Sequence, residues 1–142
     1  MTREPIYAAL FAKLEALKTA GAIATCSRRL LHWNDVGDIA QPAVFMTQGN
    51  QAASHQSKAL PFKWDLDVKI YVYVQASELV APAQVLNPIL DAIEAILAPA
   101  NGQQQTLGGL CDVCYIDGAI ETFEGTLGTQ EVAFIPVKIS VR

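Results

Sequence analysis

The stretch KWDLDVKIYVYVQ, residues 63–75, alternates apolar with polar or aromatic side chains over most of its length. Five apolar side chains fall on one side of an extended chain: Leu66, Val68, Ile70, Val72 and Val74. The side chains between them fall on the other side: Asp65, Asp67, Lys69, Tyr71 and Tyr73. This alternation predicts a strand with one face in the core and one face toward water or a partner.

Two amphipathic helices are predicted, one before and one after this strand. The first covers residues 4–19, and its apolar stripe is Ile6, Leu10, Leu14 and Leu17. Thr2 suits the N-cap of this helix, Pro5 suits its first turn, and Gly21 ends it. The second helix covers residues 82–97, with the apolar residues Leu86, Ile89, Leu90, Ile93 and Leu97.

Further strands are predicted over residues 24–33 and 42–48, around 111–123, and over 131–141. The inward set of the last strand is Ala133, Ile135, Val137, Ile139 and Val141. Pro136 lies on the other face of that strand and has no N–H to donate to a neighbour, which indicates an edge position or a bulge.

The order of elements is helix, three strands, helix, two strands. It predicts an α+β fold with a mixed, largely antiparallel sheet of about five strands and two main helices on one face of the sheet. The sequence has no internal repeat and no linker, so residues 1–142 are expected to form a single domain. The polar stretch GNQAASHQSKALP, residues 49–61, is predicted to be a hairpin tip or a mobile arm.

The composition narrows the classes of function. Hydrophobic residues make up 51% of the chain and charged residues only 17%, so the surface must be unusually apolar or partly covered by partner subunits. A net charge of −4 argues against binding DNA or RNA by neutralising phosphates. Charges interrupt the apolar N-terminal run, and no stretch is long and apolar enough to span a membrane. With an odd number of cysteines as well, we expect a soluble protein that folds in a cytoplasm.

Cys111 and Cys114 have the spacing of a zinc half-site or a redox pair. A zinc site needs a second pair of ligands, but the other candidates, Cys26, His32 and His55, are scattered along the sequence. A redox pair normally lies at the start of a helix, but this pair precedes a predicted strand. We therefore expect small, partly buried residues, with Cys114 pointing inward beside Ile116 and Cys111 more exposed. No serine lies in a nucleophile elbow, and Asp65 and Asp67 fit a solvated or interface face better than a catalytic pair. We expect no catalytic residues, no metal and no cofactor.

Arginine and aromatic residues on the predicted strands are candidates for contacts between subunits, because these types are enriched at interfaces. For Tyr71 and Tyr73 the alternative is a second packing layer. The candidate contact residues, which include residues in and beside the polar stretch, are Arg28, Arg29, Trp33, His55, Lys58, Lys63, Trp64, Tyr71 and Tyr73.

Six stretches in order carry a resemblance that covers nearly the whole chain. They are REPIYAALFAKL (3–14), SRRLLHWNDV (27–36), QPAVFMTQG (41–49), LPFKWDLDVKIYVYV (60–74), LNPILDAIEAILAP (86–99) and QTLGGLCDVCYIDGAIETFEGTLGTQEVAFIPVKI (105–139). In this order they resemble the tail-terminator proteins, also called tail-completion or minor tail proteins, of long-tailed bacteriophages and prophages. No single stretch is a catalytic signature, and the family has no catalytic residues to carry over.

The resemblance implies a non-enzymatic virion protein, assembled in the cytoplasm of the bacterial host and located at the head-proximal end of the tail. It implies a homo-oligomeric ring, commonly a hexamer, that caps the tail tube, stops its polymerisation and offers the surface to which the head–tail connector protein docks. Residues 49–61 are expected to reach a neighbouring subunit or the tube. DNA is expected to pass through without specific binding, helped by an acidic channel whose candidate residues are Asp65, Asp67, Asp112, Asp117, Glu121 and Glu124.

Two other interpretations remain open at the level of the sequence. One is another neck component, such as a head–tail connector or adaptor, which would also act by binding protein partners. A small metal- or thiol-dependent enzyme built around Cys111 and Cys114 belongs to a different class and is disfavoured by the arguments above.

Overall fold

The computed structural model describes residues 1–142 except 56, 100–101 and 125–127. The helices are α1 (Arg3–Thr19) and α2 (Pro82–Leu97), and two short 3-10 turns are η1 (Trp33–Asp35) and η2 (Asp38–Ala40). The strands are β1 (Thr25–Ser27), β2 (Ala43–Ser54), β3 (Lys63–Gln75), β4 (Val113–Ile116), β5 (Glu121–Thr122) and β6 (Gln130–Val141).

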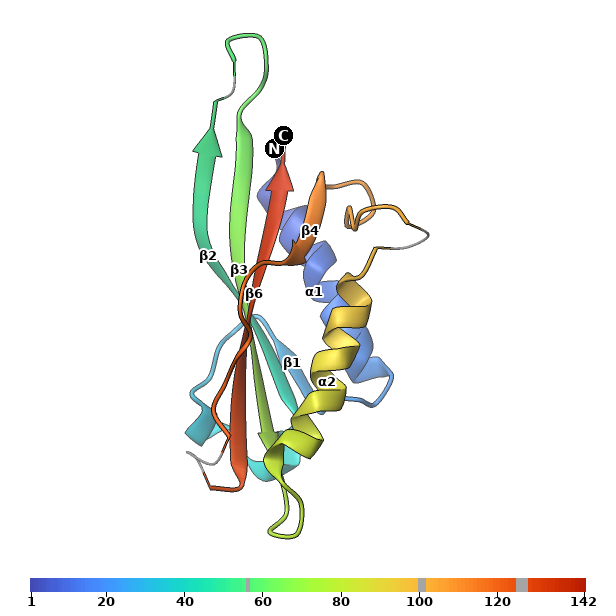
Figure 1. Ribbon diagram of the computed structural model, residues 1–142, viewed down its shortest axis with the longest axis vertical. Coiled ribbons are helices and arrows are strands. Elements are labelled where there is room, and N and C mark those ends of the chain that lie inside the picture. Colours follow the sequence, from blue (N-terminus) through green and yellow to red (C-terminus); the bar gives the residue numbers. More distant parts are fainter. Residues whose placement is uncertain (56, 100–101, 125–127) are drawn as a thin grey trace.

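These six strands form one open sheet in the order β1-β2-β3-β6-β4, with β5 also beside β6. β1 runs parallel to β2, and all the other pairs are antiparallel. The sheet is strongly twisted, and both helices lie on one of its faces, here called the inner face (Figure 1). The predicted α+β fold with a mixed, largely antiparallel sheet is confirmed.

The inner face forms the main core. The predicted stripes of both helices are buried there except Leu90, which is half-buried, and they pack against the predicted inward sets of β3 and β6. Leu10, Leu14, Ile70, Ile93, Ile135 and Ile139 have no more than a trace of exposed surface. Thr2 does stand at the N-cap of α1, although its side chain makes no capping bond, and Gly21 follows the helix with a φ of +83°.

The predicted strand over residues 24–33 is wrong beyond Ser27. β1 is only three residues long, and the chain then leaves the sheet through η1 and η2. Local polar bonds explain the departure: the Arg29 N–H donates to Ser27 Oγ, and the Asn34 N–H donates to His32 Nδ1 at 3.1 Å. Alternating apolar and polar residues here belong to a segment that folds over the sheet rather than to a strand.

Residues 28–42 cover one half of the opposite, outer face and create a second, smaller core. Its buried members are Val36, Ala43, Phe45, Tyr73 and Val132. Tyr73 is only 4% exposed, its ring lies 5.3 Å from that of Phe45, and its hydroxyl donates to the Leu31 carbonyl at 2.8 Å. For Tyr73 the structure therefore shows the second packing layer, and this residue is not available as a surface contact in the folded chain.

The predicted single strand over residues 111–123 is also wrong: β4 and β5 both pair with β6, and the break between them faces Pro136. The Asp117 N–H donates to the Pro136 carbonyl at 2.9 Å, so that carbonyl points toward the β4–β5 side of β6. The N–H and C=O of one strand residue point the same way, so the donor that proline lacks would also have faced this break. The break, rather than an outermost position, accommodates Pro136.

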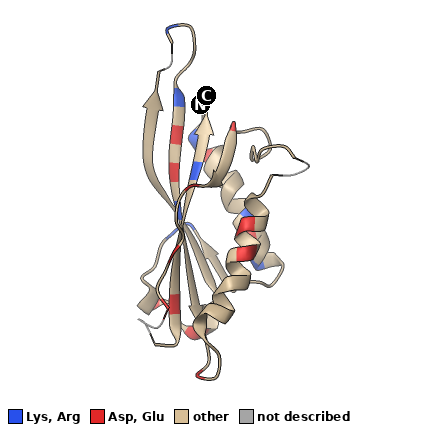
Figure 2. Ribbon diagram, in the orientation of Figure 1, with Lys and Arg blue, Asp and Glu red and all other residues tan. Residues whose placement is uncertain are grey.

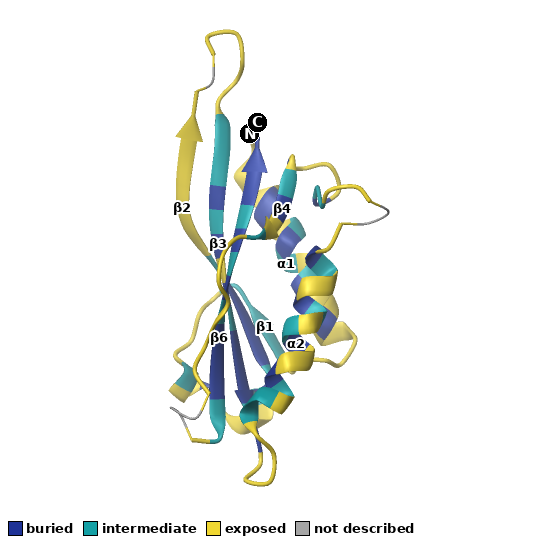
Figure 3. Cartoon of the chain, in the orientation of Figure 1, coloured by how far each residue is buried: buried dark blue, intermediate teal, exposed yellow. Residues whose placement is uncertain are grey.

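The polar stretch at residues 49–61 begins inside a strand. Residues 49–54 continue β2, and residues 48–54 are all exposed (Figure 3). Gly49 and Asn50 together face the single residue Asp67 of β3, which makes a β-bulge. A Cβ on Gly49 would lie 3.2 Å from the Asp67 carbonyl oxygen, so this close backbone approach favours glycine.

Both cysteines of the CxxC stretch are buried in the main core. Cys111 is 6% exposed and Cys114 is 1% exposed, so the expectation of a more exposed Cys111 holds only in relative terms. Burial raises the pKa of the Cys111 thiol to about 11 and that of Cys114 to about 12, and it also raises the pKa of Cys26 to about 11. Since the thiolate is the reactive form, these environments suppress both nucleophilic attack and metal binding.

We expect the three thiols to react slowly in the folded protein. At pH 8 a thiol-specific reagent should modify them at least about 100-fold more slowly than in denaturant, because raised pKa values and burial both limit access to thiolate. The measurement is the rate at which the reagent modifies the cysteines in the folded protein and in the denatured protein. A Ser57→Cys variant, whose thiol would lie on the exposed hairpin, serves as a control and should react fast. Rapid modification of a native cysteine would contradict the structural role.

Glu131 is a charged residue in an apolar position. It lies on β6 opposite Val74, is 2% exposed, and its Oε2 has no hydrogen-bond partner among the described residues. Burial, reinforced by the Glu124 carboxylate, raises the pKa of Glu131 above its usual value near 4.5. Folding therefore favours the protonated form, and stability should fall as pH rises from the unfolded pKa to the folded one.

Glu131→Gln should raise the free energy of unfolding at pH 7 by about 1 kcal/mol, because the amide cannot ionise and costs less to bury than a carboxylate. Urea unfolding at pH 7 and pH 4 measures the effect. The difference in the free energy of unfolding between Glu131→Gln and the wild type should shrink at pH 4, because the carboxyl group of Glu131 is then protonated and uncharged, like the amide. Glu94→Gln on the exposed side of α2 is the control. A gain that is equal at both pH values would show that ionisation of Glu131 is not the cause.

Candidate functional site

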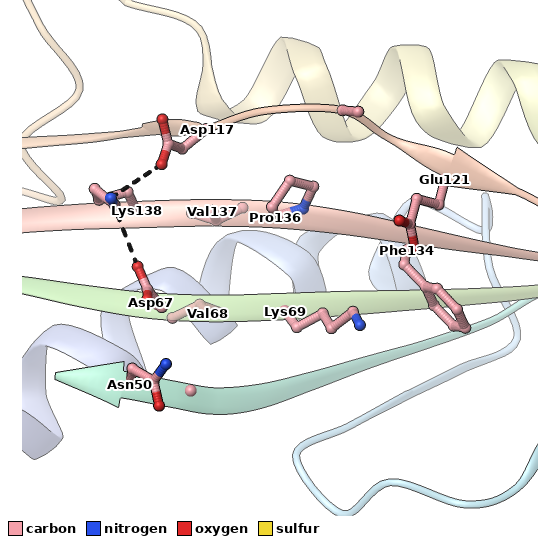
Figure 4. A pocket seen from close by; sticks show the side chains of 12 residues that line it. Asn50, Asp67, Val68, Lys69, Asp117, Glu121, Phe134, Pro136, Val137 and Lys138 are labelled. Atoms are coloured by element: carbon pink, nitrogen blue, oxygen red, sulfur yellow. Dashed lines mark ion pairs between the residues drawn. The ribbon is translucent and has the colours of Figure 1, made fainter.

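The half of the outer face that residues 28–42 do not cover forms an open groove of about 550 Å³ (Figure 4). The β2 bulge supplies one wall, β3 and β6 form the floor, and the link from β4 to β5 supplies the other wall. The lining residues are Gly49, Asn50, Asp67, Val68, Lys69, Asp117, Ala119, Glu121, Phe134, Pro136, Val137 and Lys138.

Lys138 is the central charge of the groove. Its Nζ lies 3.0 Å from Asp117 Oδ2 and 3.9 Å from Asp67 Oδ1, so it links β6 to β3 on one side and to the β4–β5 link on the other. The hydrogen bond and charge of Asp117 raise the pKa of Lys138, and Asp67 adds to this effect. The ammonium group therefore stays charged at neutral pH and keeps both carboxylates in place.

Beside this ion-pair network lies an aromatic cluster formed by Tyr71, Phe123 and Phe134. The Phe134 ring packs edge-on against Tyr71 at 4.9 Å and against Phe123 at 5.4 Å. The Lys69 ammonium lies 4.6 Å from the centre of the Phe134 ring and 5.5 Å from that of Tyr71. Phe123 is 40% exposed, which leaves an aromatic surface with charged neighbours of the kind that binds protein partners.

The lining of the groove combines charged, aromatic and aliphatic groups. Lys138 pairs with two of the acidic groups, and the cysteines lie in the main core on the other side of the sheet. Within the described part of the chain, no three His, Cys, Asp or Glu side chains are close enough to hold a metal ion. None of the described helices is long and apolar enough to cross a membrane.

The candidate contact residues from the sequence do not form one site. Tyr71 lies in the aromatic cluster, Trp33 packs against the second core, and Arg28 forms an ion pair with Glu4 of α1. Arg29 is exposed on the segment after β1, and Tyr73 is buried.

The remaining candidates lie along the β2–β3 hairpin, away from the groove. The His55 ring is 5.2 Å from that of Phe62, Lys58 is exposed at the tip, and Lys63 begins β3. The Arg3 guanidinium lies 4.8 Å from the centre of the Trp64 ring, which ties the base of this hairpin to α1. Leu60 and Phe62 are 46% and 55% exposed, so the tip combines apolar and basic groups.

Sequence reasoning missed Phe123, Phe134 and Lys138, and it named Asp117 only as a candidate for an acidic channel. A clue was present, because Phe134, Pro136 and Lys138 alternate with the recognised inward set of the last strand and must share the opposite face. Asp117 and Phe123 could not be placed, because they flank the break between β4 and β5.

The six acidic residues suggested for a channel are dispersed. Asp67, Asp117 and Glu121 line the groove together with Lys69 and Lys138. Asp65 accepts a hydrogen bond from the Ser140 hydroxyl, and Asp112 lies 3.8 Å from the Arg142 guanidinium. Figure 2 shows acidic and basic residues on the same strands, β3 and β6. This half of the outer face is therefore mixed in charge, not uniformly acidic.

Comparison with known proteins gives a likeness in fold only. No protein-family model and no curated protein matches the sequence. A protein chain in the solved virion of a native gene transfer agent particle is similar, with a TM-score of 0.56 and 11% sequence identity, over 94% of this chain and 92% of that one. A second solved protein, which has no descriptive name, has a TM-score of 0.59 and 18% identity, over 100% of this chain and 96% of the other. Nearly the whole chain therefore shares its fold with a protein of a virion particle.

Proposed function

We propose that this chain is a structural protein of a phage or a phage-like particle and that it acts as the tail terminator. In this role a homo-oligomeric ring, most simply a hexamer, caps the finished tail tube, ends its polymerisation and presents the docking surface for the head–tail connector. The protein acts through contacts and not through catalysis. DNA passes through the ring without specific binding.

The observation that carries this proposal is the likeness in fold to a virion protein over nearly the full length of both chains. Low identity limits that likeness to the fold, so the function depends on the surfaces as well. The chain has two separate candidate contact regions: the groove with its aromatic cluster, and the apolar, basic tip of the β2–β3 hairpin. A closed ring that also binds a tube needs more than one contact surface on each subunit.

The decisive experiment is to add the purified chain to polymerising tail-tube protein, taken from the gene expected to follow this one. Tubes should become shorter and carry a ring at one end, which electron microscopy measures together with tube length. A chain that is monomeric alone but forms rings on tube ends satisfies the proposal, because the tube can template assembly. Tubes of unchanged length without a cap would reject the terminator role. Rings that bind only the head connector would indicate another neck component.

Phe123→Ser should weaken assembly while leaving the fold intact. An aromatic side chain that is 40% exposed contributes little to the core, so the free energy of unfolding should change by less than about 1 kcal/mol. Loss of a central aromatic contact should weaken ring formation or tube capping by at least about tenfold. Sedimentation and the tube-length assay measure the two effects.

Leu110→Ser is the matched control, because Leu110 is 42% exposed but lies before β4 and outside the groove. It should assemble as the wild type does. Equal assembly of all three proteins would exclude the aromatic cluster as a contact between subunits or with the tube.

A further inference from the structure

We propose that the free outer edge of β2 binds an extended strand of a second copy of this chain, so that the sheet continues from one subunit to the next. The occupant is the exposed segment around β5 of the neighbouring copy, residues 117–124. This inference rests on the proposed ring and specifies how its subunits join.

The edge of β2 is long and unpaired. β1 pairs only with Ala43, Val44 and Phe45, and along residues 46–54 no described strand lies on the outer side of β2. Residues 48–54 are all exposed, and Figure 1 shows this half of β2 at the margin of the sheet with no described element on its outer side. A strand edge of this kind presents a row of backbone donors and acceptors to any extended chain.

The chemistry of β2 does not protect this edge against pairing. Edge strands of soluble proteins are usually short, or carry lysine, other charges or proline, which discourage pairing with another chain. The sequence of β2, AVFMTQGNQAAS, has twelve residues and none of these. The bulge at Gly49 and Asn50 is the exception, and it bends the strand without covering its edge.

The direction of the backbone groups follows from the neighbouring bonds. The N–H groups of Ala24 and Thr25 donate to the Pro42 carbonyl at 2.8 and 3.3 Å, so Pro42 faces the open side of β2. Alternation gives Gln48 the same direction. The bulge shifts the alternation by one residue, so beyond it the backbone groups of Gln51 and Ala53 face outward.

The free half of β2 is also held in a fixed position. The Gln51 side chain accepts a hydrogen bond from Arg3 Nε at 2.6 Å and donates to the Tyr7 hydroxyl at 3.2 Å. Both partners belong to α1, which is packed in the main core. The edge is therefore ordered before a partner strand arrives, which lowers the entropic cost of pairing.

The opposite side of the same sheet offers the matching strand. Residues 117–124 are all exposed, and among the described strands β5 pairs with β6 alone. Ile120 and Phe123 are 38% and 40% exposed. β4 is the less suitable edge, because the Cys114 N–H already donates to the Gln105 carbonyl at 2.7 Å. A head-to-tail ring needs two different open edges on each subunit. At each interface the β2 edge of one copy then pairs with the β5 edge of the next, so neither of these two edges is left open.

The strand directions also agree. β2 and β6 run one way, and β3 and β5 run the other way. When a neighbouring copy continues the sheet in the same orientation, its β5 lies antiparallel to β2, so the alternation is unbroken.

The height of the two edges fits a tilted, closing sheet. The register places Glu121 level with Phe134, Tyr71 and Phe45, five residues below Asn50 in the middle of the free edge. Because Gly49 and Asn50 share one step opposite Asp67, this offset is four strand steps, or about 13 Å along the strand. The three spacings from β2 to β5 and the one across the interface span about 19 Å. Joining the edges in a flat ring thus needs a strand tilt of about 35°, at the lower end of the range found in closed sheets.

Crosslinking between two singly substituted proteins tests the pairing directly. Gln48→Cys and Thr122→Cys each place one exposed thiol on one of the two edges, while the native cysteines are buried or half-buried. With a short bis-maleimide under assembly conditions, the mixture should give a crosslinked dimer at several times the yield of either variant alone. Gln48→Cys that crosslinks mainly to itself would overturn the proposal in favour of a two-fold pairing of β2 with β2.

Ala53→Pro removes one outward N–H and should weaken ring formation or tube capping at least tenfold, with the urea midpoint unchanged. Ala53→Ser keeps the N–H and should assemble normally. Rings that form and cap tubes without the mixed crosslink would overturn the edge pairing and leave the terminator role standing. A chain that forms no ring, alone or on tubes, would overturn both.

Discussion

The pairing of β3 with β6 is the constraint on which the rest of the structure depends. Twelve consecutive residues of each strand are in register, from Trp64 opposite Val141 to Gln75 opposite Gln130. A pleated pair of this length must present two faces, and the apolar sets of both strands fall on the same one. Both helices are recruited to that face, because only there can their apolar stripes be removed from water. The outer face is left with the charged and aromatic side chains.

The outer face is then divided by the chain itself. Residues 28–42 cover one half, and Tyr73 and Phe45 become a second core beneath them. The other half carries Lys138, held between two carboxylates, and an aromatic cluster in which Phe134 packs against Tyr71 and Phe123. The packing of the main core does not require the ion pairs of Lys138 or the aromatic cluster on the outer face. A surface that leaves Phe123 exposed beside two half-buried aromatic rings, in a chain with only 17% charged residues, is more consistent with contact than with solubility.

The sequence predicts the parts of this fold that local periodicity controls. The bounds of α2 and the inward sets of β3 and β6 follow from spacing alone. It does not predict that residues 28–33 leave the sheet, because Arg28 and Tyr73 bond to groups far away in the sequence. Nor does it predict the gap opposite Pro136, since a missing donor indicates irregular pairing without saying which neighbour is interrupted. The groove was missed for the same reason: it combines residues of β3 and β6 with a link whose position depends on that gap.

The β-bulge at Gly49 and Asn50 joins the two surfaces that the proposals use. Both residues line the groove opposite Asp67, whose carboxylate is one partner of Lys138. The same bulge shifts the backbone alternation of β2, so that Gln51 turns its side chain to α1 and its backbone to the open edge. A side chain at position 49 would press on Asp67 at 3.2 Å and disturb both arrangements together. One glycine thus couples the charge network of the outer face to the direction of the free edge.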